Sequence, residues 1–303
     1  MDKVLIALLI VVVIVLVSLV VAMLLLARYT VHGKRQSLEE AKKWQSEHYD
    51  ISWYDELDKY EYIVRTEDKY KLHVQIVRNP NKTDKYVILS HGYTDNRYGT
   101  LKYMAMYMNM GYNCIIYDLR GHGLNKRQIC TYTIQEAKDL SLIISDTYRR
   151  YENIKQLGLH GESLGGATSV ACLKYNPLVN WVVDDCGFAD LENVLKAGYG
   201  SVHLPADFTV MLVKLGIKML YHMDVDDMKP VKGLSDNKVP ILCMHGEDDT
   251  FIVPENSLRI AQETGGYSEV HMIEKAGHAA SVLTDPIRYE KFVKDFLKNI
   301  NAI

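Results

Sequence analysis

The sequence holds few of the residues that mark a disulfide-stapled, disordered or nucleic-acid-binding chain. Its 303 residues include 5 cysteines, an odd number typical of free thiols rather than a disulfide framework. The 7 prolines are scattered, and 21 tyrosines, 5 phenylalanines and 3 tryptophans accompany them, which excludes disorder. A formal net charge of −3 provides no basic field for nucleic acid. Since 48% of the residues are hydrophobic, the composition instead indicates a globular protein.

One apolar run dominates the N-terminal end. Val4 through Ala27 contains 24 residues without a charge, and Ser18 is the only polar one. As a helix the run would be about 36 Å long, enough to cross a hydrocarbon core of about 30 Å. The alternative is a cleaved signal peptide, but no Ala-x-Ala-like site precedes Arg28. We therefore expect a single-pass membrane anchor over residues 1–28 and a juxtamembrane segment over 29–59.

Two features favour a cytoplasmic position for the rest of the chain. Basic residues gather after the run: Arg28, Lys34, Arg35, Lys42 and Lys43. Such an excess of positive charge is typical of the cytoplasmic side of a membrane span. The cysteines also sit in apolar segments, as buried free thiols do in a reducing compartment.

Residues 60–303 show short apolar segments alternating with helical patterns. Two Tyr/Val/Ile-rich runs, at 61–66 and 70–78, predict a hairpin, and six further strands are expected at 86–90, 112–118, 156–160, 181–185, 240–245 and 269–274. Helices are expected between them, at 100–110, 133–151, 164–175, 190–196, 256–265 and 287–299. This alternation predicts a mostly parallel α/β sheet covered by helices on both faces. A helical cap is expected at about residues 188–237, because the apolar segment 208–223 interrupts the rhythm there.

The segment Gly161-Glu162-Ser163-Leu164-Gly165 joins a predicted strand directly to a predicted helix. A turn this tight forces the serine into strained backbone angles and lifts its Oγ clear of the sheet. Glycines at both ends leave room for the turn. We predict that Ser163 is a nucleophile.

A serine nucleophile needs an imidazole base that a carboxylate orients. His278 lies between small, turn-permitting residues, after the last predicted strand and before the last helix. The acid is expected after the penultimate strand, where three acids are adjacent; Asp249 is preferred and Asp248 is second. Asp184 and Asp185 form a weaker rival pair.

The tetrahedral intermediate of acyl transfer also needs N–H donors. Leu164 would supply one from the first turn of its helix, and Tyr93 the other from the loop after the strand at 86–90. The Tyr93 ring has two interpretations, lining an acyl pocket or packing in the structure.

Together these segments resemble the α/β-hydrolase-fold serine hydrolases, in the bacterial branch similar to serine aminopeptidases and monoacylglycerol lipases. Four blocks carry the resemblance over about residues 60–300: 91–93, 118–123, 161–165, and 245–246 with 277–278. The resemblance implies the α/β-hydrolase fold and makes Asp118–Gly123 a structural turn. The sequence departs from the family pattern between Asp249 and Pro254, which is one residue longer than Asp-x-x-Val-Pro, so Asp248 stays an alternative.

No metal or cofactor is expected. Residues 224–227, Asp-Val-Asp-Asp, lack the glycine and glutamate of an EF-hand, and the sequence has no His-Glu-x-x-His and no Gly-rich phosphate loop.

We therefore expect a membrane-anchored enzyme that hydrolyses carboxylic esters, with acyl or lysolipid-like substrates, through an acyl-enzyme intermediate. A peptidase, amidase or thioesterase of the same fold is the first alternative. The alternative of another class is an inactive, membrane-bound binding module.

Overall fold

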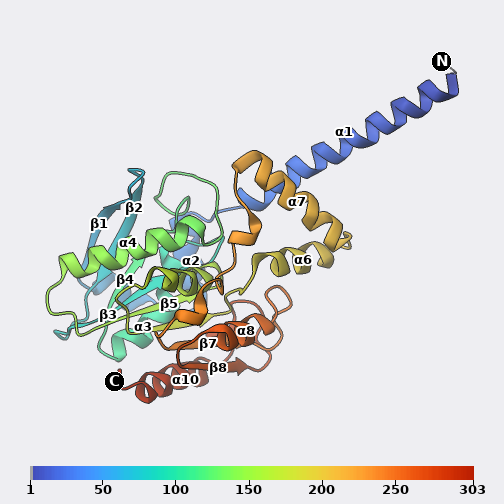
Figure 1. Ribbon diagram of the computed structural model, residues 1–303. Coiled ribbons are helices and arrows are strands. Elements are labelled where there is room, and N and C mark those ends of the chain that lie inside the picture. Colours follow the sequence, from blue (N-terminus) through green and yellow to red (C-terminus); the bar gives the residue numbers. More distant parts are fainter. Residues whose placement is uncertain (1–2) are drawn as a thin grey trace.

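The computed structural model describes residues 3–303, and its centre is one eight-stranded sheet (Figure 1). The strand order is β1-β2-β4-β3-β5-β6-β7-β8. The strands are β1 (Lys59–Arg65), β2 (Lys71–Val77), β3 (Lys85–Ser90), β4 (Asn113–Tyr117), β5 (Gln156–Glu162), β6 (Trp181–Asp185), β7 (Ile241–Gly246) and β8 (Ser268–Ile273). β1 and β2 form the predicted hairpin, and β2 is antiparallel to β4, whereas the remaining neighbours are parallel.

Helices cover both faces of this sheet because its central strands are buried on both sides. Side chains of β3 alternate between two apolar clusters: Val87 and Leu89 belong to one cluster, and Tyr86 and Ile88 belong to the other. The first cluster includes side chains of α3 (Leu101–Asn109) and α10 (Pro286–Asn299), and the second those of α4 (Ile134–Arg150), α5 (Leu164–Cys172) and α8 (Glu255–Glu263). The predicted α/β fold, mostly parallel and covered on two sides, is confirmed.

The segment between β6 and β7 forms the cap. It contains α6 (Leu191–Ser201) and α7 (Ala206–Tyr221), followed by a short 3₁₀ turn at Val225–Asp227. The helix expected at 190–196 thus continues to Ser201. In Figure 1 both cap helices project from the sheet on the side where α1 leaves the body.

α1 (Lys3–Val31) is longer than the apolar run that predicts it. It is the one helix among residues 3–303 that is long and apolar enough to cross a membrane. Residues 3–21 are exposed, whereas Met23, Ala27 and Val31 are buried. Figure 1 shows the first part of α1 projecting from the body as a stalk. Packing on the cap therefore extends the helix beyond Ala27.

α2 (Leu38–His48) follows and begins at a capping box, whose Ser-x-x-Glu spacing is read directly from Ser37 to Glu40 in the sequence. The Glu40 N–H donates to Ser37 Oγ over 3.1 Å, and the Ser37 N–H donates to Glu40 Oε2 over 2.7 Å. α9 (Ser281–Thr284) is a single turn that the sequence pattern does not predict.

Candidate active site

The turn from β5 into α5 places Ser163 in backbone angles that L-residues seldom adopt, with φ 54° and ψ −115°. The two glycines of the motif permit this turn for a steric reason. A Cβ on Gly161 would lie 2.1 Å from the Gly165 carbonyl oxygen, and one on Gly165 would lie 2.2 Å from that of Ser90. Helix α5 can therefore approach the sheet edge only without side chains there. A strained turn of this kind exposes the serine Oγ at the edge of the sheet.

Ser163, His278 and Asp249 form one line of hydrogen bonds. Ser163 Oγ lies 2.9 Å from His278 Nε2, and His278 Nδ1 lies 2.7 Å from Asp249 Oδ2. His278 comes from the loop between β8 and α9, and Asp249 from the loop after β7. These loops and the elbow all follow parallel strands, so three distant parts of the chain meet at one sheet edge.

Asp249, and not its neighbour Asp248, faces His278. Asp249 is buried, and its Oδ1 accepts the N–H groups of Phe251 and Ile252, each over 2.9 Å. Burial alone would raise the pKa of Asp249, but hydrogen bonds from His245 and His278 hold that pKa well below its ordinary value. Asp248 is exposed. The carboxylate beside the imidazole is therefore ionised and held in a fixed orientation.

The rival acids have other partners. Asp185 Oδ2 accepts the hydroxyls of Tyr103 and Tyr289 over 2.8 and 2.9 Å, beneath the elbow. Asp184 is fully buried beside Gly166 and Gly187, and burial raises its pKa to about 7. The structure therefore brings neither of these acids to His278.

The two expected oxyanion donors flank the serine. Leu164 is the first residue of α5, and N–H groups in the first turn of a helix have no intrahelical acceptor. A Cβ on Gly92 would lie 3.8 Å from Ser163 Cβ, so the loop that carries Tyr93 passes beside the nucleophile. Tyr93 is also tied at its carbonyl, which accepts a short hydrogen bond of 2.5 Å from His122 Nε2.

The Tyr93 ring packs against the end of α1. Its hydroxyl donates to the Thr30 carbonyl over 2.7 Å and accepts the Gly33 N–H over 3.0 Å. The ring stacks on Tyr132, with centroids 5.4 Å apart, and the Arg35 guanidinium lies 4.4 Å from its centre. Of the two interpretations, the structure shows packing.

His245, the last but one residue of β7, also contacts Asp249 and was not anticipated from the sequence. Its Nε2 lies 2.6 Å from the Ile252 carbonyl oxygen and 3.3 Å from Asp249 Oδ2, and its Nδ1 lies 2.7 Å from Ser257 Oγ. Burial opposes its protonation, yet the Asp249 carboxylate raises the pKa of His245 overall. The sequence signal that could have found His245 was a histidine at the end of a strand, separated by one glycine from a run of acids.

Two further side chains adjoin this edge. The Phe251 ring meets the His278 ring edge-on at a centroid distance of 5.1 Å and is half exposed. Glu162, within the elbow motif, forms a buried ion pair with Lys102. The site thus has an apolar outer margin and a charged, buried base.

Among residues 3–303, one group of potential metal ligands lies close together, and it is part of this same site. Cys186, Asp249 and His278 bring their ligand atoms within 4.8 Å of one another. Because His278 Nδ1 donates its proton to Asp249 Oδ2, that nitrogen has no lone pair left for an ion.

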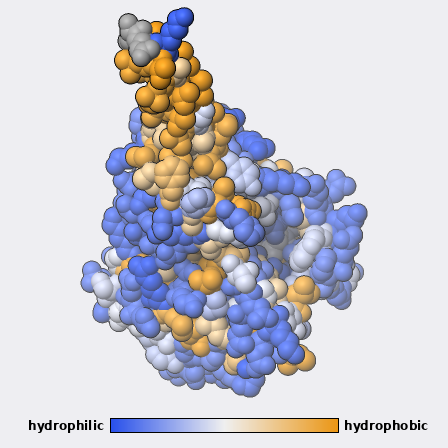
Figure 2. Space-filling model, turned by 90° about the vertical axis from the view of Figure 1, so that its right-hand side faces the viewer, coloured by the Kyte–Doolittle hydropathy of each residue, from blue (hydrophilic) through white to orange (hydrophobic). Residues whose placement is uncertain are grey.

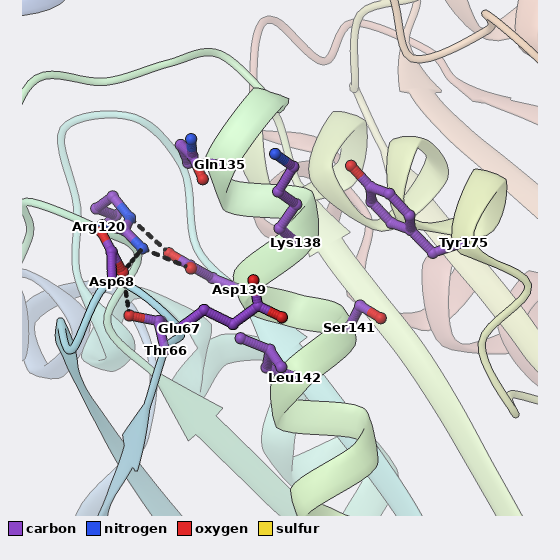
Figure 3. A pocket seen from close by; sticks show the side chains of 10 residues that line it. All are labelled: Thr66, Glu67, Asp68, Arg120, Gln135, Lys138, Asp139, Ser141, Leu142 and Tyr175. Carbon is purple, nitrogen blue, oxygen red and sulfur yellow. Dashed lines mark hydrogen bonds and ion pairs between the residues drawn. The ribbon is translucent and has the colours of Figure 1, made fainter.

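A separate cavity of about 490 Å³ opens between the β1–β2 hairpin and α4 (Figure 3). One of its two lining cations, Arg120, is paired with Asp68 and Asp139, and the other is Lys138. None of Ser163, His278 or Asp249 lines this cavity, so it lies apart from the serine.

Comparisons with known proteins place this geometry in a family. An uncharacterized protein of Bacillus subtilis, YqkD, is 28% identical over 228 residues, which cover 73% of this chain and 74% of that protein. The fold is similar to that of a Pyrococcus furiosus esterase, with a TM-score of 0.68, 22% identity, and 80% of this chain and 92% of the esterase covered. It is also similar to a Pyrococcus horikoshii acylaminoacyl peptidase, with a TM-score of 0.64, 15% identity, and 82% and 43% covered.

The model of the prolyl oligopeptidase family matches residues 98–302, which is more than half of the chain and includes the elbow and both loops described above. The chain therefore belongs to the prolyl oligopeptidase family and is a serine hydrolase of the α/β-hydrolase fold.

Proposed function

We propose that the protein is a membrane-anchored hydrolase of carboxylic esters, with Ser163, His278 and Asp249 as its catalytic residues. The observation that carries the proposal is the continuous line from Ser163 Oγ to His278 over 2.9 Å and from His278 to Asp249 over 2.7 Å. These three groups have the geometry that serine-based acyl transfer requires.

In the proposed mechanism, Ser163 Oγ attacks the ester carbonyl carbon while His278 Nε2 takes the hydroxyl proton. The N–H groups of Tyr93 and Leu164 stabilise the resulting oxyanion. When the intermediate collapses, the bond to the alcohol breaks and His278 protonates the departing oxygen. Water then attacks the acyl-enzyme, gives its proton to His278, and releases the acid as Ser163 regains the proton. Asp249 stays ionised and orients the imidazole throughout.

An ester with an acyl chain or lysolipid-like body is favoured over a peptide by two features. Half-exposed Phe251 provides an apolar wall beside His278. Recognition of a substrate amino group would need free acids, and the acids of the cap segment 224–227 all pair with lysines: Lys214, Lys218, Lys229 and Lys232. The cap therefore offers no uncompensated negative charge in this segment.

A peptidase is the second candidate, because the family is named for peptidases and the Pyrococcus horikoshii neighbour is an acylaminoacyl peptidase. A thioesterase would use the same residues, since all these reactions pass through an acyl-serine.

A panel of p-nitrophenyl esters, acyl thioesters and aminoacyl amides, assayed with the full chain in detergent, separates these candidates. We expect the highest kcat/KM on esters, with Ser163→Ala lowering kcat by more than about 10⁴-fold. A preference for amides would replace the ester assignment by the peptidase. If a fluorophosphonate probe fails to label the wild type, the chain is an inactive binding module and the whole mechanism falls.

We propose further that α1 anchors the enzyme with its catalytic domain in the cytoplasm. All five cysteines are free and buried, and basic residues follow the apolar run. A membrane-permeant fluorophosphonate should label intact cells, whereas an impermeant one should label only after lysis. Equal labelling by both probes would place the domain outside.

A further inference from the structure

The cap helix α7 presents three different faces. Val210, Val213 and Ile217 are buried toward the body. Lys214 and Lys218 lie on a polar side, where acids pair with them. The third face, which we call the apolar stripe, consists of four side chains that are 47–56% exposed: Phe208, Met211, Leu215 and Met219. Their spacing of three and four residues places all four on one side of the helix.

An exposed stripe of this kind is unusual in this molecule. Apart from α1, no other helix among residues 3–303 exposes more than two large apolar side chains, whereas α7 also exposes Leu220. Figure 2 shows the apolar stalk of α1 on a body whose visible surface is mostly hydrophilic. Four aligned, half-exposed apolar residues therefore call for a partner.

The position of α7 along α1 indicates which partner. The part of α1 that is exposed throughout, residues 3–21, is about 28 Å long at 1.5 Å per residue. That length nearly equals a hydrocarbon core of about 30 Å. The first buried residue of α1 is Met23, and it lies against α7. If α1 spans a bilayer, α7 lies where the hydrocarbon ends.

Close packing holds the two helices together at this level. A Cβ on Gly216 would lie 2.6 Å from the Met23 carbonyl oxygen and 2.7 Å from Ala27 Cβ. Met219 lies three residues after Gly216, and residues at that spacing are neighbours on a helix surface, so the apolar stripe adjoins the face of α7 that α1 covers. Figure 1 shows α7 crossing α1 near the base of the stalk. The exposed apolar surface of α1 thus continues onto α7.

We propose that α7 lies in the interface of the lipid bilayer, with the apolar stripe inserted beside the anchor. The inference rests on the proposed anchoring by α1 and goes beyond it, because it makes the cap a second membrane contact. Since Lys214 and Lys218 are paired with acids of the cap, the contact is apolar and should not require anionic lipid.

The cap is also connected to the proposed active site. A Cβ on Gly198 of α6 would lie 3.9 Å from the Phe251 ring, and that ring contacts His278. In α6, the Tyr199 hydroxyl lies 3.0 Å from Thr30 Oγ1 of the anchor. If the cap lies in the bilayer interface, lipid would therefore be close to the apolar wall that Phe251 forms.

The test places an environment-sensitive fluorophore on the full chain in phosphatidylcholine vesicles. The five native cysteines are buried, so a new exposed thiol can be labelled selectively. We would label Leu215→Cys on the apolar stripe and Val12→Cys in the middle of the exposed part of α1. Ile287→Cys on α10, which is apolar and 82% exposed, is the matched control. Quenching by spin-labelled lipid then reports contact with the acyl chains.

We expect lipid quenching at positions 12 and 215, at least threefold stronger than at 287, and unchanged when anionic lipid is added. Quenching at 12 but not at 215 would overturn the inference while leaving the anchor intact. No quenching at either position would overturn both. Position 215 could also be shielded from quenching by spin-labelled lipid in a way that disappears when the protein is diluted at constant lipid. That result would assign the apolar stripe to a second copy of the chain and overturn the inference as well. None of these readouts depends on catalysis, so loss of the ester assignment would leave them unchanged.

Discussion

The sheet edge that carries Ser163 and the contact between α1 and α7 are stabilised in opposite ways. At the sheet edge, buried polar groups pair with one another: Glu162 with Lys102, Asp185 with two tyrosines, and Asp249 with His278. At the helix contact, Gly216 brings two backbones together and apolar side chains fill the surroundings. A polar cluster should thus respond to loss of a single partner and to pH, whereas the helix contact should respond to side-chain volume.

The largest expected effect tests the polar side. Asp249→Asn should lower kcat by roughly 10³–10⁴-fold, because the amide cannot hold His278 in the required tautomer. Steady-state kinetics on a short p-nitrophenyl ester measures this, with Asp248→Asn as the matched control. Since Asp248 is exposed and does not contact His278, its variant should keep near-normal activity. A loss of similar size in the control would move the acid to position 248.

The second effect is a pH dependence of stability. Burial, reinforced by the charge of Asp185 and opposed by His245, raises the pKa of Asp184 to about 7 in the folded state from an ordinary value of 3.8. Below about pH 4 the Asp184 carboxyl is protonated in both the folded and the unfolded protein, so its contribution to stability is fully present. As the pH rises toward 7, the carboxyl ionises first in the unfolded protein, and this stability is therefore lost. Between pH 5 and pH 8 we expect Asp184 to contribute a loss of about 3 kcal/mol, and Asp184→Asn should remove that part of the slope. Asp95, Asp139 and Asp185, whose pKa values burial raises to about 6, should keep the remaining slope.

Urea unfolding of the detergent-solubilised protein at the two pH values measures this difference. The relevant quantity is the slope with pH, because the amide introduced by Asp184→Asn adds a cost that does not depend on pH. Asp248→Asn, which removes an exposed carboxyl, should keep the wild-type slope. An unchanged slope in Asp184→Asn would mean that another buried acid carries the titration.

The third effect tests packing between helices. Gly216→Ala should destabilise the protein by about 1–3 kcal/mol, because the new methyl would overlap the backbone of α1 at Met23. Gly200→Ala in α6 is the matched control, since a Cβ there meets nothing within 4 Å, and it should change stability by less than about 1 kcal/mol. Thermal unfolding distinguishes the two variants. Equal stability of both would contradict close packing of α1 on the cap.

The smallest effect concerns the residue that joins the two regions. Tyr93→Phe keeps the proposed oxyanion N–H but loses the hydroxyl bonded to Thr30 and Gly33. We expect kcat to fall about five- to tenfold with KM unchanged, a loss equivalent to one hydrogen bond of about 1 kcal/mol. Tyr132→Phe, which loses a hydrogen bond to the same Thr30 carbonyl from outside the loop, should leave kcat near normal. Equal losses would indicate a general effect of loosening the contact between α1 and the body.

Much of the fold could be predicted because its signals are local. Alternating short apolar strands and helices predict the parallel sheet, and the strand at 181–185 is found at its predicted bounds. The capping box predicts where α2 begins, and it depends on residues only three positions apart. Helix ends that depend on packing were predicted less accurately: α6 ends at Ser201 and not at 196, and α1 ends at Val31 and not at Ala27.

The site shows the same division at the level of single residues. Ser163 and its glycines form one continuous turn, so their arrangement could be anticipated from their order in the sequence. The choice between Asp248 and Asp249 could not, since it depends on how a loop approaches His278, 29 residues away. The second histidine on Asp249, His245, escaped notice for the same reason.

The apolar run at 4–27 already specifies a long hydrophobic helix, because length and composition suffice to define one. The tertiary structure alone decided that the end of this helix packs on α7 and that Tyr93 points toward it rather than toward a substrate pocket. Those outcomes depend on surfaces made by segments far apart in the chain, whose mutual fit no local pattern encodes.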